Sequence, residues 1–296
     1  MSAPTQAVLF DAPGPRARRK ILVGSVLAAA AVLAVLVLVV LRLADRGQFE
    51  AELWAPLVDP RTEEFPLVWE RLGGGLLVTL QAAAVAVVAS LVVGVLLATA
   101  RLGLGRTARL PVVGLIELLR GLPVVVTILV VDTLFRTIGF DVATFWSLVV
   151  GLTLYNCVII AEITRAGVLS LPRGQVEAGL AVGLTRGQVM RLIQLPQALR
   201  AMLPAIISQL VVILKDTALA SVVLSGVDDL LRVADRLRIT LDNPLQTYFV
   251  VAVVYIVINL VLDRFAQWLQ KRLSRGRQGG RAARAAMAAG EATTGA

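Results

Sequence analysis

Long stretches without any charged residue are the strongest constraint on the fold of this chain. Residues 21–41 form 21 consecutive uncharged positions, and further uncharged runs occupy 72–100, 142–161 and 243–262, each at least 20 residues long. An α-helix rises about 1.5 Å per residue, so about 20 residues cross the hydrocarbon core of a bilayer. Each of these runs is therefore predicted to be a transmembrane helix.

Two other apolar stretches, 110–131 and 201–227, carry charges in their interior. Counting both as spans gives six helices, and the expected fold class is all-α, a polytopic transmembrane helical bundle. Composition agrees, because only 17% of the residues are charged where a soluble domain has about 25%. The interrupting charges are Glu117, Arg120, Lys215 and Asp216.

The charges between the runs predict the orientation. Lys and Arg gather in short cytoplasmic loops of membrane proteins. Here they gather before residue 21, after the second and fourth predicted spans, and in the C-terminal segment, whereas 44–70 is predominantly acidic. We therefore expect both termini in the cytoplasm, six spans, and an extracytoplasmic segment at 44–70.

The two ends of the chain allow less specific predictions. Residues 1–20 are expected to be a cytoplasmic N-terminus and 21–43 a retained transmembrane helix. A cleaved signal peptide is the rival interpretation, but its apolar core is typically about 7–15 residues long. The Ala-, Gly- and Arg-rich segment 273–296 has no hydrophobic periodicity and is predicted to be a disordered cytoplasmic tail.

The residue inventory excludes several kinds of chemistry. The chain has no histidine, one cysteine (Cys157) and three lysines, so it offers no Ser/His/Asp triad and no histidine-ligated metal site. No lysine follows a glycine, which excludes a phosphate-binding loop of the G-x-x-x-x-G-K-[ST] type. We expect no catalytic residue, metal or cofactor on this chain.

The segment 170–196 is the most patterned part outside the apolar runs. Its first half predicts a short helix that Ser170 caps and that Gly183 ends in a left-handed conformation. Thr185, followed three residues later by Gln188, is a capping-box pattern for a second helix. Pro196 is expected to terminate or kink that helix. On periodicity alone, an amphipathic helix resting on lipid headgroups remains an alternative.

The same segment resembles the EAA loop of ABC importer permeases. In that family the loop is the coupling helix that docks into a groove of the ATPase subunit. Its third motif position is usually alanine and here is Gly179, which is expected to weaken the helix by up to about 1 kcal/mol and to allow a closer approach of the partner. The resemblance implies ATPase coupling by Glu177, Ala178, Gly183, Ile193, Leu195 and Pro196.

The resemblance extends over roughly residues 72–270 and narrows to the polar amino-acid permeases, the histidine, glutamine and glutamate uptake group. It implies a type I importer permease domain at 71–272 with a five-helix core, to which 21–43 would be an addition. The opening residues 8–19 resemble the start of glutamate-type permeases of high-GC bacteria, which favours glutamate. The core resemblance lies in Thr79-Leu80, in the stretches 117–123, 151–156 and 161–165, in 174–178 and 195–200, and in 214–221.

The family also implies partners and a location. The chain would translocate its substrate across the bacterial cytoplasmic membrane together with an ABC ATPase dimer, a homologous permease subunit and an extracytoplasmic amino-acid-binding protein. ATP and Mg would bind to the ATPase, so this chain would not itself be an enzyme. Neither the resemblance nor the charge pattern implies a nucleic-acid partner.

Polar residues inside the spans are candidates for the translocation pathway, because polar groups within a bilayer are costly. Glu117 and Arg120 are able to pair beside a helix break, and shaping that break is the alternative role for both. Gln81 and Asn156 are equally suited to interhelical hydrogen bonds. The predicted pathway residues are Gln81, Glu117, Asn156, Lys215, Asp216 and Thr217, and the predicted break residues are Arg120, Gly121 and Pro123.

Two other classes of protein are weighed against the importer. An ion-gradient-driven secondary transporter of small polar solutes would need no ATPase, but it is expected to show internal repeats of broken helices, and none is visible. A membrane enzyme would need a second acid or base near Glu117 or Asp216, and none converges with them in the sequence.

Overall fold

The computed structural model describes residues 14–140, 142–219 and 223–294, with side chains except at 269, 270 and 273–294. These residues are helical or in loops and contain no strand. Residues 220 and 221 of the 214–221 stretch and most of the opening 8–19 motif lie outside them. The helices are α1 (Pro15–Asp45), α2 (Ala51–Val58), α3 (Glu64–Gly103), α4 (Arg106–Arg120), α5 (Val124–Thr137), α6 (Thr144–Leu169), α7 (Arg173–Ala181), α8 (Arg186–Gln188), the π-helix η1 (Val189–Gln194), α9 (Leu195–Thr217), α11 (Leu230–Thr240) and α12 (Pro244–Thr294).

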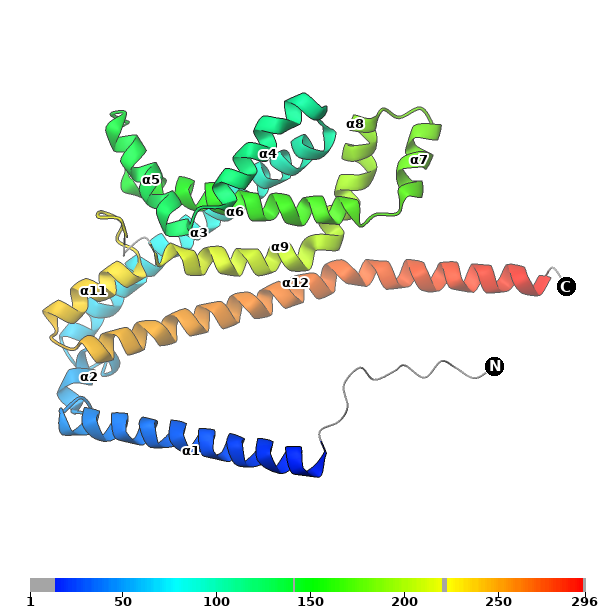
Figure 1. The fold of residues 1–296 in the computed structure, drawn as a ribbon. Helices are drawn as coiled ribbons and strands as arrows, with labels where there is room; N and C mark the ends of the chain where they lie inside the picture. The colour runs from blue at the N-terminus through cyan, green and yellow to red at the C-terminus, as the bar shows by residue number, and fades with distance from the viewer. Residues whose placement is uncertain (1–13, 141, 220–222, 295–296) are drawn as a thin grey trace.

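Five helical stretches are long and apolar enough to cross a membrane: α1, α3, α6, the continuous stretch Arg186–Thr217, and Pro244–Trp268 of α12. The pair α4 and α5 would make a sixth span, although it is bent by 110°. Helices α6 and α9 lie side by side, and α9 also packs against α12 (Figure 1). The all-α membrane bundle predicted from the uncharged runs is confirmed.

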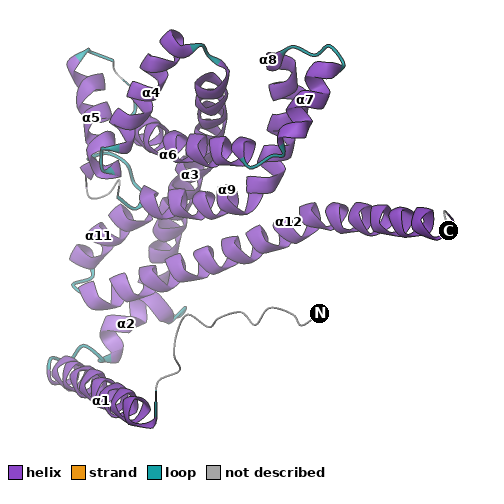
Figure 2. Cartoon of the chain, turned by 45° about the vertical axis from the view of Figure 1, so that its right-hand side comes forward, coloured by secondary structure: helices purple, strands orange, loops and turns teal. Residues whose placement is uncertain are grey.

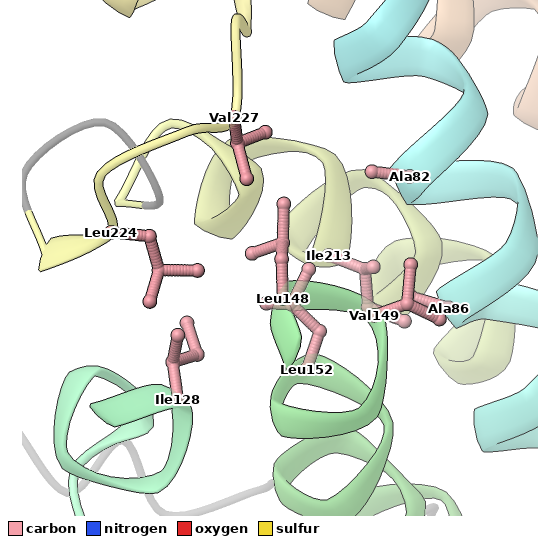
Figure 3. Close-up of a cluster of buried hydrophobic side chains, with 9 residues drawn as sticks. All are labelled: Ala82, Ala86, Ile128, Leu148, Val149, Leu152, Ile213, Leu224 and Val227. Atoms are coloured by element: carbon pink, nitrogen blue, oxygen red, sulfur yellow. The ribbon is translucent and has the colours of Figure 1, made fainter. Parts of the chain in front are cut away.

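The centre of the bundle is an apolar cluster shared by α3, α5, α6, α9 and the segment after α9. Figure 3 shows these side chains converging on α6. Glycine allows the close approach: a Cβ on Gly151 of α6 would lie 2.7 Å from Ile128 Cα, well inside van der Waals contact. The buried members are Ala82, Ala86, Ile128, Leu148, Val149, Leu152, Ile213, Leu224 and Val227.

A second apolar cluster joins α2, α3, α11 and α12 at the end of the bundle away from α7. Helix α3 begins at Glu64, so it already starts inside the segment 44–70, for which the sequence predicts no transmembrane helix. The first turns of α3 were not predicted as helix because they contain charged residues up to Arg71. A helix outside the bilayer can carry such residues, since only one of its faces needs to be apolar. Its buried members are Leu57, Val68, Leu72, Leu230, Ala234, Leu237 and Val251.

The two terminal helices differ from the bundle. Helix α1 has no buried residue and stands apart from the other helices in both views (Figures 1 and 2). Helix α12 continues to Thr294, through the segment for which composition predicts a disordered tail. Alanine and arginine have high intrinsic helix propensity, which agrees with this continuation.

Candidate functional site

The segment 170–196 leaves the end of α6 and returns into α9 as a helical hairpin (Figure 1). After α7 the chain turns at Gly183, whose φ of 86° is a conformation that favours glycine. At the start of α8, Thr185 Oγ accepts a hydrogen bond from the Gln188 N–H at 3.3 Å. Gln188 Oε1 accepts one from the Thr185 N–H at 2.8 Å. The left-handed turn and the capping box are both as the sequence predicted.

One detail of this segment differs from the prediction. Ser170 does not cap α7: the N-cap is Pro172, and Ser170 Oγ instead donates to the Gly167 carbonyl at 2.8 Å. Of the two outcomes expected at Pro196, the kink is the one found: α8 passes through η1 into α9 with Pro196 in the first turn of α9, and the helix changes direction there (Figure 1). A π-helical turn shifts the backbone hydrogen bonds just before Pro196, so the helix accommodates a residue that has no N–H.

The inner face of the hairpin is tightly packed around Gly179. Gly179 and Val189 are both buried. A Cβ on Gly179 would lie 2.8 Å from Val189 Cγ2 and 2.9 Å from Ile193 Cδ1. The close approach that glycine allows at this motif position is therefore between α7 and η1 of the same chain, and not toward a partner as the sequence suggested.

The outer face of the hairpin is exposed and partly apolar. Glu177, Ala178 and Gly183 are exposed, and the large apolar side chains Val182 and Leu192 are 77% and 65% exposed. Both residues lie in the same short hairpin, and large apolar side chains gathered on a protein surface are typical of a binding site. The remaining coupling residues lie where the hairpin joins the bundle: Ile193 and Leu195 are half-buried and Pro196 is exposed.

Four charged side chains connect α3, α4 and α6 near the base of the hairpin. The side chain of Arg101, 13% exposed, donates to Glu162 and lies 3.7 Å from Glu117 through Nη2 and Oε1. Glu162 also pairs with Arg165 at 2.9 Å, as the sequence suggested. Glu117 thus pairs with Arg101 instead of its helical neighbour Arg120, because the packing of α4 against α3 and α6 brings Arg101 to it.

The helical path is interrupted between α4 and α5 at the predicted position. Gly121 is the C-cap of α4 and Pro123 is the N-cap of α5, with an extended ψ of 144°. A proline cannot donate a backbone hydrogen bond and disfavours helical geometry in the residue before it. Arg120, the last residue of α4, is exposed.

One predicted pathway residue forms an interhelical contact. Asn156 of α6 is fully buried. Its Oδ1 accepts a hydrogen bond from Gln209 Nε2 of α9 at 2.7 Å, and its Nδ2 donates to the Leu152 carbonyl. The interhelical alternative weighed for Asn156 is what the structure contains. Gln209 was not among the predicted residues, although it is an amide inside an apolar span.

The other pathway candidates do not share a cavity in the described part of the chain. Gln81 and Lys215 are exposed, Asp216 is half-buried, and Thr217 is buried with its hydroxyl donating to the Leu214 carbonyl at 2.6 Å. The recess between α3, α9 and α12, of about 380 Å³, is lined by apolar side chains alone. A single chain therefore does not assemble these candidates into a closed site.

A bundle of apolar helices with a protruding, exposed helical hairpin defines a polytopic membrane protein. The chain belongs to the family of binding-protein-dependent transport system inner membrane components, whose family model matches residues 90–275. It is a membrane permease with the fold of type I ABC importers.

Two relatives match most of the chain in sequence. It is 35% identical over 238 residues to the glutamate transport system permease protein GluD of Corynebacterium glutamicum, covering 79% of this chain and 85% of the relative. It is also 35% identical over 203 residues to the glutamine transport system permease protein GlnP of Escherichia coli K12, covering 67% of this chain and 91% of the relative.

Solved structures show the same arrangement. The crystal structure of an amino acid ABC transporter with histidines matches with a TM-score of 0.62 and 28% identity, over 69% of this chain and 94% of that one. An inward-facing MetNI methionine ABC transporter matches with a TM-score of 0.60 and 21% identity, over 72% and 99%. The second match bears on the fold alone.

Proposed function

We propose that this chain is the permease subunit of an ATP-driven ABC importer that translocates a polar amino acid, with glutamate the favoured substrate. Family membership and the amino-acid transporters among its relatives support the substrate class. Similarity to GluD supports glutamate within that class. The secondary-transporter alternative leaves the exposed hairpin without a role.

The exposed face of the 170–196 hairpin is the observation that carries this proposal. Glu177, Val182 and Leu192 are all exposed on the hairpin, and the hairpin continues directly into α6 and α9. A groove on an ABC ATPase would bury the apolar residues, and its movement would be transmitted to both helices. ATP and Mg would be bound by the ATPase dimer, and this chain would supply no catalytic residue.

The remaining partners follow from what a single chain lacks. The pathway candidates Gln81 and Lys215 are exposed on α3 and α9, so a second permease, homologous or identical, would complete the path for the substrate. A binding protein would deliver the amino acid at the end opposite the hairpin. In this arrangement both termini are cytoplasmic, the chain crosses the cytoplasmic membrane six times, and α1 is an added helix.

The test is purification of the tagged chain from membranes of its own host, followed by an assay for co-purifying ATPase activity. Wild type is expected to bring down an ATPase. Glu177→Lys is expected to lose it, because the reversed charge faces the groove. The matched control is Glu52→Lys, which reverses an exposed acidic residue on α2, outside the hairpin.

Both variants are checked for membrane yield and thermal unfolding, so that a folding defect is recognised. Uptake of labelled glutamate, glutamine, aspartate and arginine into proteoliposomes then ranks the substrates. Absence of an ATPase from well-folded wild type would contradict the importer function. Equal ATPase recovery with Glu177→Lys would contradict the role of the hairpin.

A further inference from the structure

A polar recess lies at the opposite end of α6 from the hairpin. It has a volume of about 400 Å³ and lies where α5 ends and α6 begins. Helix α6 has 26 residues, which places its two ends about 39 Å apart. The volume is within the range of pockets that hold small ligands. The lining residues are Asp132, Phe135, Arg136, Gly139, Phe140, Val142, Ala143, Thr144 and Ser147.

The recess contains one fixed charge of each sign. Arg136 Nε donates to Asp132 Oδ2 at 2.8 Å, one helical turn apart on α5. The Asp132 side chain is only 15% exposed, whereas that of Arg136 is 62% exposed. The carboxylate is therefore held inside the recess, and the guanidinium lies at its more open side.

The α6 side of the recess offers donors that have no partner. Ser147 is 2% exposed and lines the recess, and its hydroxyl makes no hydrogen bond in the described part of the chain. The first N–H groups of a helix have no intrahelical acceptor, and no side chain caps α6 at Ala143. The helix dipole adds partial positive charge at the same place.

We infer that this recess binds the zwitterionic head of an α-amino acid, as the first site that the substrate meets on the permease. The substrate ammonium lies against Asp132. The substrate carboxylate lies between Arg136, the Ser147 hydroxyl and the first turn of α6, all of which favour an anion. The side chain of the amino acid points out of the recess, so the site recognises the class of substrate and not one member.

This inference rests on the proposed function, since the amino acid comes from the binding protein on this side of the membrane. The empty site keeps both charges because Asp132 and Arg136 pair with each other. An arriving amino acid replaces that internal ion pair with two new ones. Its ammonium pairs with Asp132, and its carboxylate pairs with Arg136. A dicarboxylate without an amino group leaves Asp132 unmatched, so the recess discriminates against it.

The experiment uses the purified transporter complex in detergent, without binding protein or ATP. The probe is whichever of L-glutamate, L-glutamine, L-aspartate and L-arginine the reconstituted wild type takes up fastest. Equilibrium binding is measured for the labelled amino acid, with its deaminated analogue as competitor. Asp132→Asn is expected to weaken binding by about tenfold, the usual size of one lost charge-assisted contact, and to lose the preference over the deaminated analogue.

A second measurement guards against variants that fold poorly. In a Cys157→Ser background, Ala143→Cys places a thiol at an exposed position that lines the recess. It is labelled with a small thiol reagent, and the amino acid is expected to slow labelling. The matched control is Asp228→Asn, which breaks an exposed ion pair with Arg236 outside the recess and is expected to bind like wild type.

The outcomes separate the two proposals. Unchanged binding and unchanged discrimination in Asp132→Asn would overturn the recess, as would labelling of Ala143→Cys that the amino acid does not slow. ATP-driven uptake by wild type would still uphold the importer in either case. Failure of wild type to show ATP-driven uptake of any of the four amino acids would overturn the proposed function and, with it, the recess.

Discussion

The two ends of the bundle are built in different ways. At the end away from the hairpin, buried side chains bond to distant backbone: Asn243 Nδ2 donates to the Leu53 carbonyl at 2.8 Å, and the Leu230 N–H donates to Thr79 Oγ at 3.0 Å. The hairpin is held by local contacts, such as the capping box at Thr185, and leaves Val182 and Leu192 exposed.

The difference lies in what holds each end together. Buried polar groups that are satisfied within the chain hold an end together without a partner. Exposed apolar groups lower the free energy only when another surface covers them. In the proposed importer another protein would cover the hairpin. The opposite end, which we call the closed end, is held to the bundle around α2, α11 and the start of α12 by hydrogen bonds within the chain.

Asn243→Ala is expected to produce the largest effect, because it opens the closed end. Asn243 is 1% exposed, donates to the Leu53 carbonyl, and accepts a hydrogen bond from Thr247 Oγ at 2.7 Å. Alanine removes both hydrogen bonds and leaves the buried Thr247 hydroxyl without this acceptor, which costs about 3 kcal/mol in the free energy of unfolding. Thermal unfolding in detergent should move to lower temperature, while ATPase recovery at low temperature stays unchanged.

The control for Asn243→Ala is Gln267→Ala. Gln267 donates an exposed hydrogen bond, also of 2.8 Å, to Asp263 on its own helix. Water replaces this bond, so the unfolding temperature should hardly change. Equal losses in the two variants would show that burial does not distinguish the closed end.

The parts of the fold that depend on neighbouring residues were predictable from the sequence. Uncharged runs predict the spans because each charged residue would by itself raise the free energy of inserting a helix into the bilayer. The helix break at Gly121 and Pro123 is predictable because proline has no backbone N–H to donate. The pairing of Arg101 with Glu162 was not predictable, since it depends on which helices become neighbours. The early start of α3 at Glu64 was missed because its charges resemble those of a loop.

The second-largest change in stability is expected from a substitution of Asp229, which is the N-cap of α11 at the closed end. Its Oδ1 accepts from the Arg232 N–H at 3.1 Å, while Oδ2 is buried without a partner. Burial raises the pKa of this carboxyl to about 6, although hydrogen bonds from backbone N–H groups oppose the rise. The folded state therefore holds a proton up to about pH 6 that the unfolded chain releases near pH 4.

The sign of the pH dependence follows from that difference. The folded state binds more protons than the unfolded state between about pH 4 and 6, so the contribution of Asp229 to stability falls as the pH rises through that window. Asp229→Asn keeps a capping oxygen and removes the buried charge. It should stabilise the protein at pH 7.5 by on the order of 2 kcal/mol and match wild type near pH 4.

The prediction is tested by measuring the thermal unfolding temperatures of Asp229→Asn and wild type from pH 4 to pH 7.5. Asp228→Asn is the control, because Asp228 is the exposed neighbouring carboxyl. If wild type and Asp229→Asn lose stability in parallel with rising pH, the buried carboxyl is not the group that titrates.

The candidate site shows the same division between local and distant signals. The capping box at Thr185 and the left-handed Gly183 were predictable because each depends on a few adjacent residues. The pair Asp132 and Arg136 was missed, since the third apolar stretch was taken to end at 131. Their one-turn spacing on a helix was the signal that could have found them.

Thr185→Ala tests the local construction of the hairpin. Losing the hydroxyl removes one N-cap bond, worth about 1 kcal/mol. Because the hairpin is stabilised locally, hydrogen exchange at the α8 and η1 amides should become about fivefold faster, with no change in global unfolding. Thr185→Ser keeps the capping oxygen and should exchange like wild type. A drop in the global unfolding temperature with Thr185→Ala would mean that the hairpin and the closed end unfold together.

Gly179→Ala should give the smallest effect, because two terms oppose each other. Alanine favours the helix by about 1 kcal/mol over glycine. Its Cβ would meet the Val189 and Ile193 side chains at 2.8 and 2.9 Å, so these side chains or α7 itself must shift. Gly174→Ala on the same helix gains only the increase in helix propensity, since nothing lies within 4 Å of its Cβ.

Hydrogen exchange in α7 should slow in Gly174→Ala and stay near wild type in Gly179→Ala. ATPase affinity should fall about threefold in Gly179→Ala only, roughly the 0.7 kcal/mol expected when a small displacement disturbs a fitted surface. Equal exchange and equal affinity in the two variants would mean that the packing of α7 on η1 does not set the shape of the docking face.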